Sequence, residues 1–172
     1  LIDLDPVADA TLQVRNGILF IDVVERKPAF VWRTQDGLEL LDETGHYVRA
    51  ITARLDYPNL PLVAGKGADR NIEQAQALLA SVAPLSHRLR GLVYVGERRW
   101  DIVLDRDQRI MLPADGAVQA LEKVLILNDT QELLDRAISV VDMRLSERPT
   151  LRLADGTSGT LLRQIKSSGT DQ

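Results

Sequence analysis

The sequence predicts an α+β fold, in which two or three helices pack on a mixed and mostly antiparallel β-sheet. Three observations support this prediction. Short runs of β-branched and apolar residues are bounded by turn signals such as Asn16-Gly17. Two longer segments have apolar residues at helical spacing. Strand and helix signals do not alternate strictly, as they would in a parallel β-α-β protein.

The first 50 residues are expected to form strands joined by tight turns. Asn16-Gly17 separates two candidate strands, and this dipeptide between such runs is the strongest short-range signal of a hairpin. Pro28 ends the second strand, because proline cannot donate a hydrogen bond to a sheet ladder. The strands expected in this part of the chain are 10–15, 18–25, 29–33 and 38–41.

Two segments have apolar residues at three- and four-residue spacings and are expected to be helices. The first runs from about residue 69 to 82 and the second from about 115 to 127. A short third helix is expected at 131–136, after an Asp129-x-x-Glu132 string that resembles a capping box. The residues expected to face the core are Ile72, Ala75, Leu79, Val82, Ala117, Leu121, Val124 and Leu125.

The second half of the chain also contains strand signals. Apolar and polar residues alternate from Trp100 to Leu104, as in a half-buried strand, and Trp100 is expected to be largely buried. The expected strands are 89–95, 100–104, 109–112, 138–145 and 150–153, besides one short strand within an ordered loop at 57–67. Residues 155–172, rich in Gly, Ser, Thr and Asp, are expected to be a mobile tail. Its Leu161-Leu162-x-x-Ile165 cluster is a candidate for docking elsewhere on the protein.

The composition is that of an ordinary globular domain. The chain has 172 residues, is 45% hydrophobic and 27% charged, and carries a net charge of -4 with both signs interleaved. Lysines and arginines form no continuous stripe for a nucleic-acid backbone, so no nucleic-acid partner is expected. The absence of cysteine excludes disulfides, thiolate metal sites and cysteine nucleophiles.

No catalytic, cofactor or metal site is expected. Gly65-Lys66-Gly67 precedes a helix but does not end a Gly-x-x-x-x-Gly-Lys-Ser/Thr string, so we interpret it as a tight loop. His46 and His87 have no second ligand at metal-binding spacing. No serine lies in a Gly-x-Ser-x-Gly context, although a Ser-His-Asp triad dispersed along the chain is left open.

Arginines gather in two parts of the chain, and their spacing allows two interpretations. As solvated strand faces they would discourage edge-to-edge aggregation. As a binding surface they would offer bidentate contacts to acidic side chains of a partner. The spacing favours neither interpretation. The arginines concerned are Arg88, Arg90, Arg98, Arg99, Arg144, Arg148 and Arg152.

Five short strings occur in a specific order over residues 18–153. They are ERKPAFVW at Glu25–Trp32, LDETG at Leu41–Gly45, LPLVAG at Leu60–Gly65, RWDIVL with IMLP at Arg99–Leu104 and Ile110–Pro113, and VDMR at Val141–Arg144. Together these strings resemble the FtsQ/DivIB family of bacterial cell-division proteins, although Ala29-Phe30 shifts the first pattern by one residue.

The resemblance implies that an FtsQ-type β domain is preceded by the closing part of a small POTRA domain. Leu1–Pro6 resembles the opening of a POTRA domain, whereas Val7–Glu25 already resembles its closing hairpin. The helices that would lie between these two parts are missing. Either they are deleted, or disordered residues near positions 6–7 are left out of this sequence. The second interpretation is favoured. The expected parts are 1–26 (partial POTRA domain), 27–153 (β domain) and 154–172 (tail).

The resemblance also implies a function. Family members are non-enzymatic divisome scaffolds that bind the FtsB-FtsL pair at the division septum. They are single-pass inner-membrane proteins whose chain lies mostly in the periplasm, so the resemblance implies an N-terminal anchor helix absent from this sequence. It implies no cofactor. An exposed terminal strand independently suits strand addition by a partner. The implied binding residues are Arg98, Arg144, Leu145, Glu147, Thr150, Leu151, Arg152 and Leu153.

Two positions depart from the family pattern, and two other functions stay open. Glu97 is acidic where some relatives have arginine, and Leu145 replaces an aromatic residue. The chain could instead be a POTRA-type module of an outer-membrane assembly or secretion system, although it shows neither tandem repeats nor a barrel. The other open function is that of a small hydrolase or nucleotide binder that uses Gly65-Lys66-Gly67.

Overall fold

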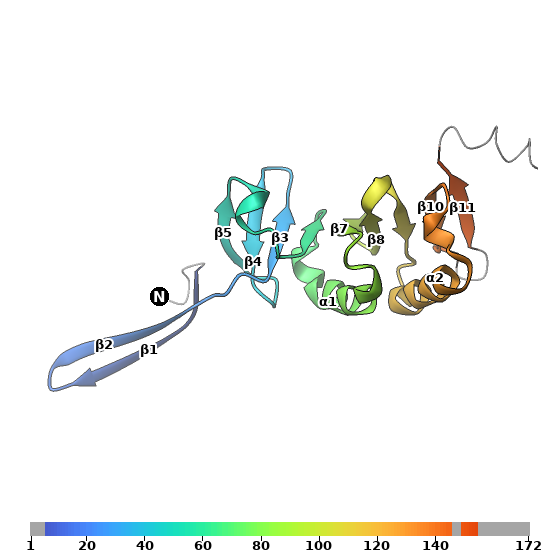
Figure 1. The fold of residues 1–172 in the computed structure, drawn as a ribbon. Helices are drawn as coiled ribbons and strands as arrows, with labels where there is room; N and C mark the ends of the chain where they lie inside the picture. The colour runs from blue at the N-terminus through green and yellow to red at the C-terminus, as the bar shows by residue number, and fades with distance from the viewer. Residues whose placement is uncertain (1–5, 146–148, 155–172) are drawn as a thin grey trace, which may run out of the picture. The chain divides into compact units, whose positions relative to one another are not determined.

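The structure is a computed structural model that describes residues 6–145 and 149–154. These residues form an α+β fold of strands and two α-helices, which confirms the predicted fold class (Figure 1). The strands are β1 (Val7–Arg15), β2 (Ile18–Glu25), β3 (Phe30–Arg33), β4 (Leu38–Leu41), β5 (Tyr47–Ile51), β6 (Leu62–Ala64), β7 (Leu89–Val95), β8 (Arg99–Leu104), β9 (Arg109–Met111), β10 (Ile138–Asp142) and β11 (Thr150–Leu153). The helices are α1 (Ile72–Ser81) and α2 (Ala117–Gln131).

Short 3-10 turns complete the described elements, and the strands form two sheets. The turns are η1 (Arg54–Asp56), η2 (Asp69–Asn71), η3 (Ala83–Leu85), η4 (Asp105–Asp107) and η5 (Leu133–Asp135). One sheet is the β1-β2 hairpin, and the other has nine strands in the order β11-β10-β9-β8-β7-β6-β3-β4-β5. The pairs β3-β4, β4-β5, β8-β9 and β10-β11 are antiparallel, whereas β3-β6, β6-β7 and β9-β10 are parallel.

The chain divides into two compact units. Of the described residues, the first unit takes in 6–76 together with 91–97, and the second takes in 77–90, 98–145 and 149–154. The domain boundary at residues 26–27, which the family resemblance implies, stays a prediction. No helix in the described part of the chain has the length and hydropathy of a membrane span.

The predicted N-terminal hairpin is present in the first unit. Asn16 and Gly17 have φ values of 52° and 76°, the left-handed conformations that a tight two-residue hairpin turn requires. Strand β1 begins at Val7, three residues earlier than expected, and pairs with β2 from Arg15↔Ile18 back to Val7↔Glu25. Large apolar side chains of the hairpin are exposed at Leu12, Val14, Ile18, Leu19, Phe20, Ile21, Val23 and Val24.

The rest of the first unit is built around β3. This strand pairs with β4 on one side and with β6 on the other. Val31, Leu40 and Val48 form a buried cluster against which Leu38 and Ile51 pack. Strand β5, which contributes Val48, was not predicted. Its sequence, YVRAI, does not alternate apolar and polar residues, and only Val48 is buried, so periodicity did not reveal this strand.

The second unit has a clear apolar side. Trp100 is 1% exposed, which confirms its predicted burial. Ile102, Leu104, Ile110 and Val141 on β8, β9 and β10 are also buried, as are Ala120, Leu121 and Val124 of α2. Of the residues predicted to face the core, Leu79, Ala117 and Leu125 are only half-buried, whereas Leu78 is buried.

The chain after α2 differs from the prediction. Helix α2 continues to Gln131, and the predicted capping box is absent because Asp129 lies inside the helix. Glu132 ends the helix in a left-handed conformation, with its backbone N–H donating to the carbonyl oxygen of Asn128. The predicted short helix at 131–136 is therefore the single 3-10 turn η5.

Candidate protein-binding strand edge

Strand β11 lies at one end of the nine-stranded sheet. Among the described strands, β10 is its one pairing partner, in an antiparallel register that runs from Ile138↔Leu153 to Asp142↔Thr150. All four residues of β11 are exposed. An edge strand of this kind presents a row of backbone N–H and C=O groups that can pair with another chain.

Two hydrogen bonds identify which backbone groups of β11 face β10. The backbone N–H of Ala154 donates to the carbonyl oxygen of Ala137 at 2.9 Å, and the N–H of Met143, just after β10, donates to the carbonyl oxygen of Met111 in β9 at 2.8 Å. The backbone of Val141, two residues before Met143, therefore also faces β9, so Val141 and its partner Leu151 are not hydrogen-bonded to each other. The backbone groups of successive residues in an antiparallel strand point alternately to opposite sides. The N–H and C=O of Leu151 therefore face the open edge.

The side chains of β11 continue the two faces of the sheet. Leu151 lies directly opposite the buried Val141, so it extends the apolar face, and it is 47% exposed. Leu153, two residues later, is 38% exposed. Arg152 lies opposite Val140 and belongs to the other face. A strand added at this edge would meet apolar side chains on one face and a cation on the other.

The chain bends at the end of β10 because Arg144 folds back on Asp142. The guanidinium donates to the carboxylate from Nε at 2.9 Å and from Nη2 at 2.6 Å, and the Arg144 backbone N–H donates to the same group at 3.0 Å. These bonds hold the pKa of Asp142 below its usual value. The bend explains why the strand predicted at 138–145 ends at Asp142.

This bend places Arg144 and Leu145 beside the start of β11. Asp142, Arg144, Leu145 and Thr150 line one small open hollow. Leu145 is 71% exposed, which makes it an apolar side chain available to a partner. Among the predicted binding residues, Glu147 lies outside the described residues.

Arg98 does not lie on this edge. It is exposed in the turn before β8, and the sheet order places β9 and β10 between β8 and β11. Three strand spacings of about 4.8 Å each separate β8 from β11 by roughly 14 Å. The register Asp101↔Met111↔Asp142↔Thr150 nevertheless puts the Arg98 end of β8 at the same end of the sheet as Thr150.

Arg88 has a structural role that sequence spacing could not distinguish. Its side chain is 8% exposed, and its guanidinium binds Asp105, Asp135, the Gln108 side chain and the Leu134 carbonyl oxygen. For this arginine the structure supports neither of the two predicted interpretations, since it is neither a solvated residue nor one available to a partner. It fixes the turn η5 that leads into β10.

Arg99 and Arg109 form a second charged cluster, which the sequence analysis missed as a unit. Both form ion pairs with Asp101, which is fully buried. Burial raises the pKa of Asp101 even though the two arginines lower it. Alternation along β8 could have shown that Arg99 and Asp101 share a face, but only the register brings Arg109 beside them.

The glycine loop has a structural explanation. A Cβ atom on Gly65 would lie 2.1 Å from the carbonyl oxygen of Tyr94, so only glycine fits there. Lys66 Nζ lies 2.7 Å from a carboxylate oxygen of Glu97. Within residues 6–145 and 149–154, no group of three or more His, Asp or Glu residues is placed to hold a metal ion.

Comparisons with known proteins agree with the five sequence strings. The family model "Cell division protein FtsQ/DivIB, C-terminal" matches residues 30–144. The chain is 49% identical over 156 residues to the cell division protein FtsQ of Roseobacter litoralis, a match that covers 90% of this chain and 53% of the relative. It is 50% identical over 151 residues to that of Paracoccus denitrificans, covering 87% and 44%.

A third relative matches nearly the whole chain. The cell division protein FtsQ of Cereibacter sphaeroides is 44% identical over 171 residues, which cover 98% of this chain and 56% of the relative. The chain thus spans about half the length of the curated relatives that it matches. Since the family model alone covers well over half of the sequence, the chain belongs to the FtsQ/DivIB family of cell division proteins.

Proposed function

We propose that this chain is the partner-binding part of a non-enzymatic division scaffold, and that it binds the FtsB-FtsL pair by strand addition at β11. Membership of the FtsQ/DivIB family supports a role in cell division. The proposal places the full-length protein in the inner membrane at the septum, with this part in the periplasm. The observation that carries the binding mode is the open edge of β11, with the N–H of Leu151 facing outward.

The chemistry of this edge defines the partner segment. Main-chain hydrogen bonds to β11 supply affinity, and side-chain pockets on the two faces supply specificity. Exposed Leu151 and Leu153 favour apolar partner residues on one face, and exposed Leu145 adds an apolar side chain near Thr150. Arg152 favours an acidic partner residue on the other face. Alternating apolar and acidic residues in an extended segment would satisfy both faces.

A pair of substitutions at Leu151 separates the backbone contribution from that of the side chain. Leu151→Pro removes the outward amide donor, while Leu151→Ala keeps the donor and removes most of the side chain. A backbone hydrogen bond contributes about 0.5–1.5 kcal/mol net, so we expect Leu151→Pro to bind a soluble FtsB-FtsL pair about tenfold more weakly than Leu151→Ala, since its ring also obstructs the added strand.

The measurement is calorimetric titration of each variant, with circular dichroism as the control for folding. Because the Leu151 amide does not pair with β10, the proline variant is expected to keep the β10-β11 ladder. Equal affinity of both folded variants and the parent would exclude β11 as the interface.

A further inference from the structure

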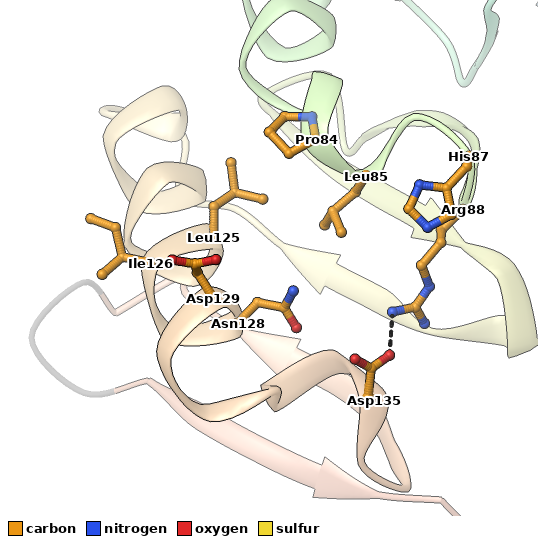
Figure 2. A pocket seen from close by; sticks show the side chains of 9 residues that line it. All are labelled: Pro84, Leu85, His87, Arg88, Leu125, Ile126, Asn128, Asp129 and Asp135. Atoms are coloured by element: carbon orange, nitrogen blue, oxygen red, sulfur yellow. Dashed lines mark hydrogen bonds and ion pairs between the residues drawn. The ribbon is translucent and has the colours of Figure 1, made fainter.

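A groove in the second unit plays no part in the proposed strand addition (Figure 2). It lies between the residues that follow α1 and the C-terminal half of α2, and it holds about 520 Å³. Figure 2 shows Leu125 and Ile126 on α2, with Pro84 and Leu85 on the opposite wall. His87, Arg88, Asn128, Asp129 and Asp135 complete the lining.

The groove combines an apolar wall with acidic groups. Ile126 is 63% exposed, which is a large apolar surface for a helix residue of a folded domain. Asp135 is already paired with two arginines, Arg88 at 3.3 Å and Arg106 at 3.7 Å. Asp129 is exposed and forms no ion pair with any residue of the described part of the chain. The groove therefore suits a segment that is both apolar and basic.

The chain itself supplies such a segment. Leu161-Leu162-Arg163-Gln164-Ile165-Lys166 has three apolar and two basic residues. On a helical turn the residues at positions 161, 162 and 165 would share one face, because residues three and four apart are neighbours. The basic residues would then lie beside that face.

The route from β11 to the groove is short enough. Ala154, the last described residue, is hydrogen-bonded at 2.9 Å to Ala137, which is two residues from the groove residue Asp135. The six residues 155–160 can span up to about 20 Å. A tether of this length gives the segment an effective concentration on the order of millimolar, which favours occupancy by a short sequence.

We propose that residues 161–166 of the same chain occupy this groove, with their apolar side chains against Leu125 and Ile126 and a basic side chain beside Asp129. The apolar and basic side chains of residues 161–166 match the apolar wall and the acidic Asp129 of the groove. It is independent of the strand-addition proposal, because it concerns a different surface of the second unit.

The test uses methyl NMR spectra of Ile126 and Leu125 and hydrogen exchange of residues 161–166 in the 172-residue chain. Leu162→Ser combined with Ile165→Ser changes none of the described residues. We expect it to move the Ile126 and Leu125 methyl signals and to raise exchange in 161–166 to the rate of residues 168–172. Ser167→Ala combined with Ser168→Ala is the matched control, and it should change neither.

A charge exchange tests the orientation of the segment. Asp129→Lys should reduce protection of residues 161–166 several-fold, and adding Arg163→Glu and Lys166→Glu should restore it. The proposal would be overturned if the tail substitutions did not change the Ile126 and Leu125 methyl signals. It would also be overturned if, in the parent chain, residues 161–166 exchanged as fast as residues 168–172. Signals that depend on protein concentration would overturn it too, because they would assign the groove to a second copy.

Discussion

Replacing Arg88 with alanine should destabilise the second unit strongly. The guanidinium is buried and donates to Asp105 at 2.9 Å and to the Leu134 carbonyl oxygen at 3.3 Å, besides its bond to Gln108. Hydrogen bonds from charged groups contribute about 1.5–3 kcal/mol each. The partners of Arg88 differ in exposure, and Asp135 is 64% exposed and screened by solvent, so its ion pair adds little.

The expected loss is about 3 kcal/mol, since the bonds to buried Gln108 and Leu134 dominate and part of the packing is also lost. For a chain of this size that loss lowers the melting temperature by roughly 6–12 °C. Urea unfolding followed by circular dichroism measures it. Arg106→Ala is the matched control, because Arg106 donates to the same Leu134 carbonyl oxygen at 3.0 Å from a side chain that is 53% exposed.

The Arg106→Ala control should lower the free energy of unfolding by less than about 1 kcal/mol, because exposed charge contacts usually contribute no more than that. An Arg88→Ala midpoint within the error of the parent's would refute the claim that this network fixes η5. Equal losses for the Arg88 and Arg106 variants would refute the claim that burial of the guanidinium sets the magnitude.

Trp100→Ala should cost about 3–5 kcal/mol, because a 1% exposed aromatic leaves a large cavity; an unchanged urea midpoint would contradict its place in the core. Hydrogen bonds from Thr44 and Arg26 outweigh burial and lower the pKa of Asp42, so its stabilisation is present above the unfolded pKa of about 3.9 and is lost as pH falls below it. Asp42→Asn should therefore reduce the loss of stability as pH falls below about 4, and a pH profile parallel to the parent's would exclude this role. Arg144→Glu should weaken FtsB-FtsL binding more at low salt than at high salt, and titrations at two salt concentrations with no difference would exclude a charge contact.

Local patterns predicted the elements whose cause is local. The Asn16-Gly17 turn formed because those two residues accept positive φ values. The alternation around Trp100 predicted its burial correctly, but the strand is not half-buried as expected, because Asp101 on the other face is also buried between Arg99 and Arg109. In contrast, the end of β10 depends on a side-chain contact between Arg144 and Asp142, which hydrophobic periodicity does not encode.

The candidate site was only partly accessible from the sequence. The resemblance indicated β11 and the residues around Arg144, but the direction of each backbone amide depends on the β10-β11 register and its irregularity near Ser139. Spacing also could not separate the buried Arg88 from the exposed Arg98, because burial is decided by residues distant in sequence. The charged cluster of Arg99 and Arg109 around Asp101 could likewise be recognised only from the strand pairing.

Amide hydrogen exchange at two neighbouring residues tests strand addition most directly. The N–H of Leu151 faces the open edge, whereas the backbone of Arg152 faces β10. Saturating the chain with a soluble FtsB-FtsL pair should slow exchange of the Leu151 amide at least tenfold and leave that of the already paired Arg152 amide nearly unchanged. Binding of the pair with no slowing at Leu151 would contradict strand addition at β11.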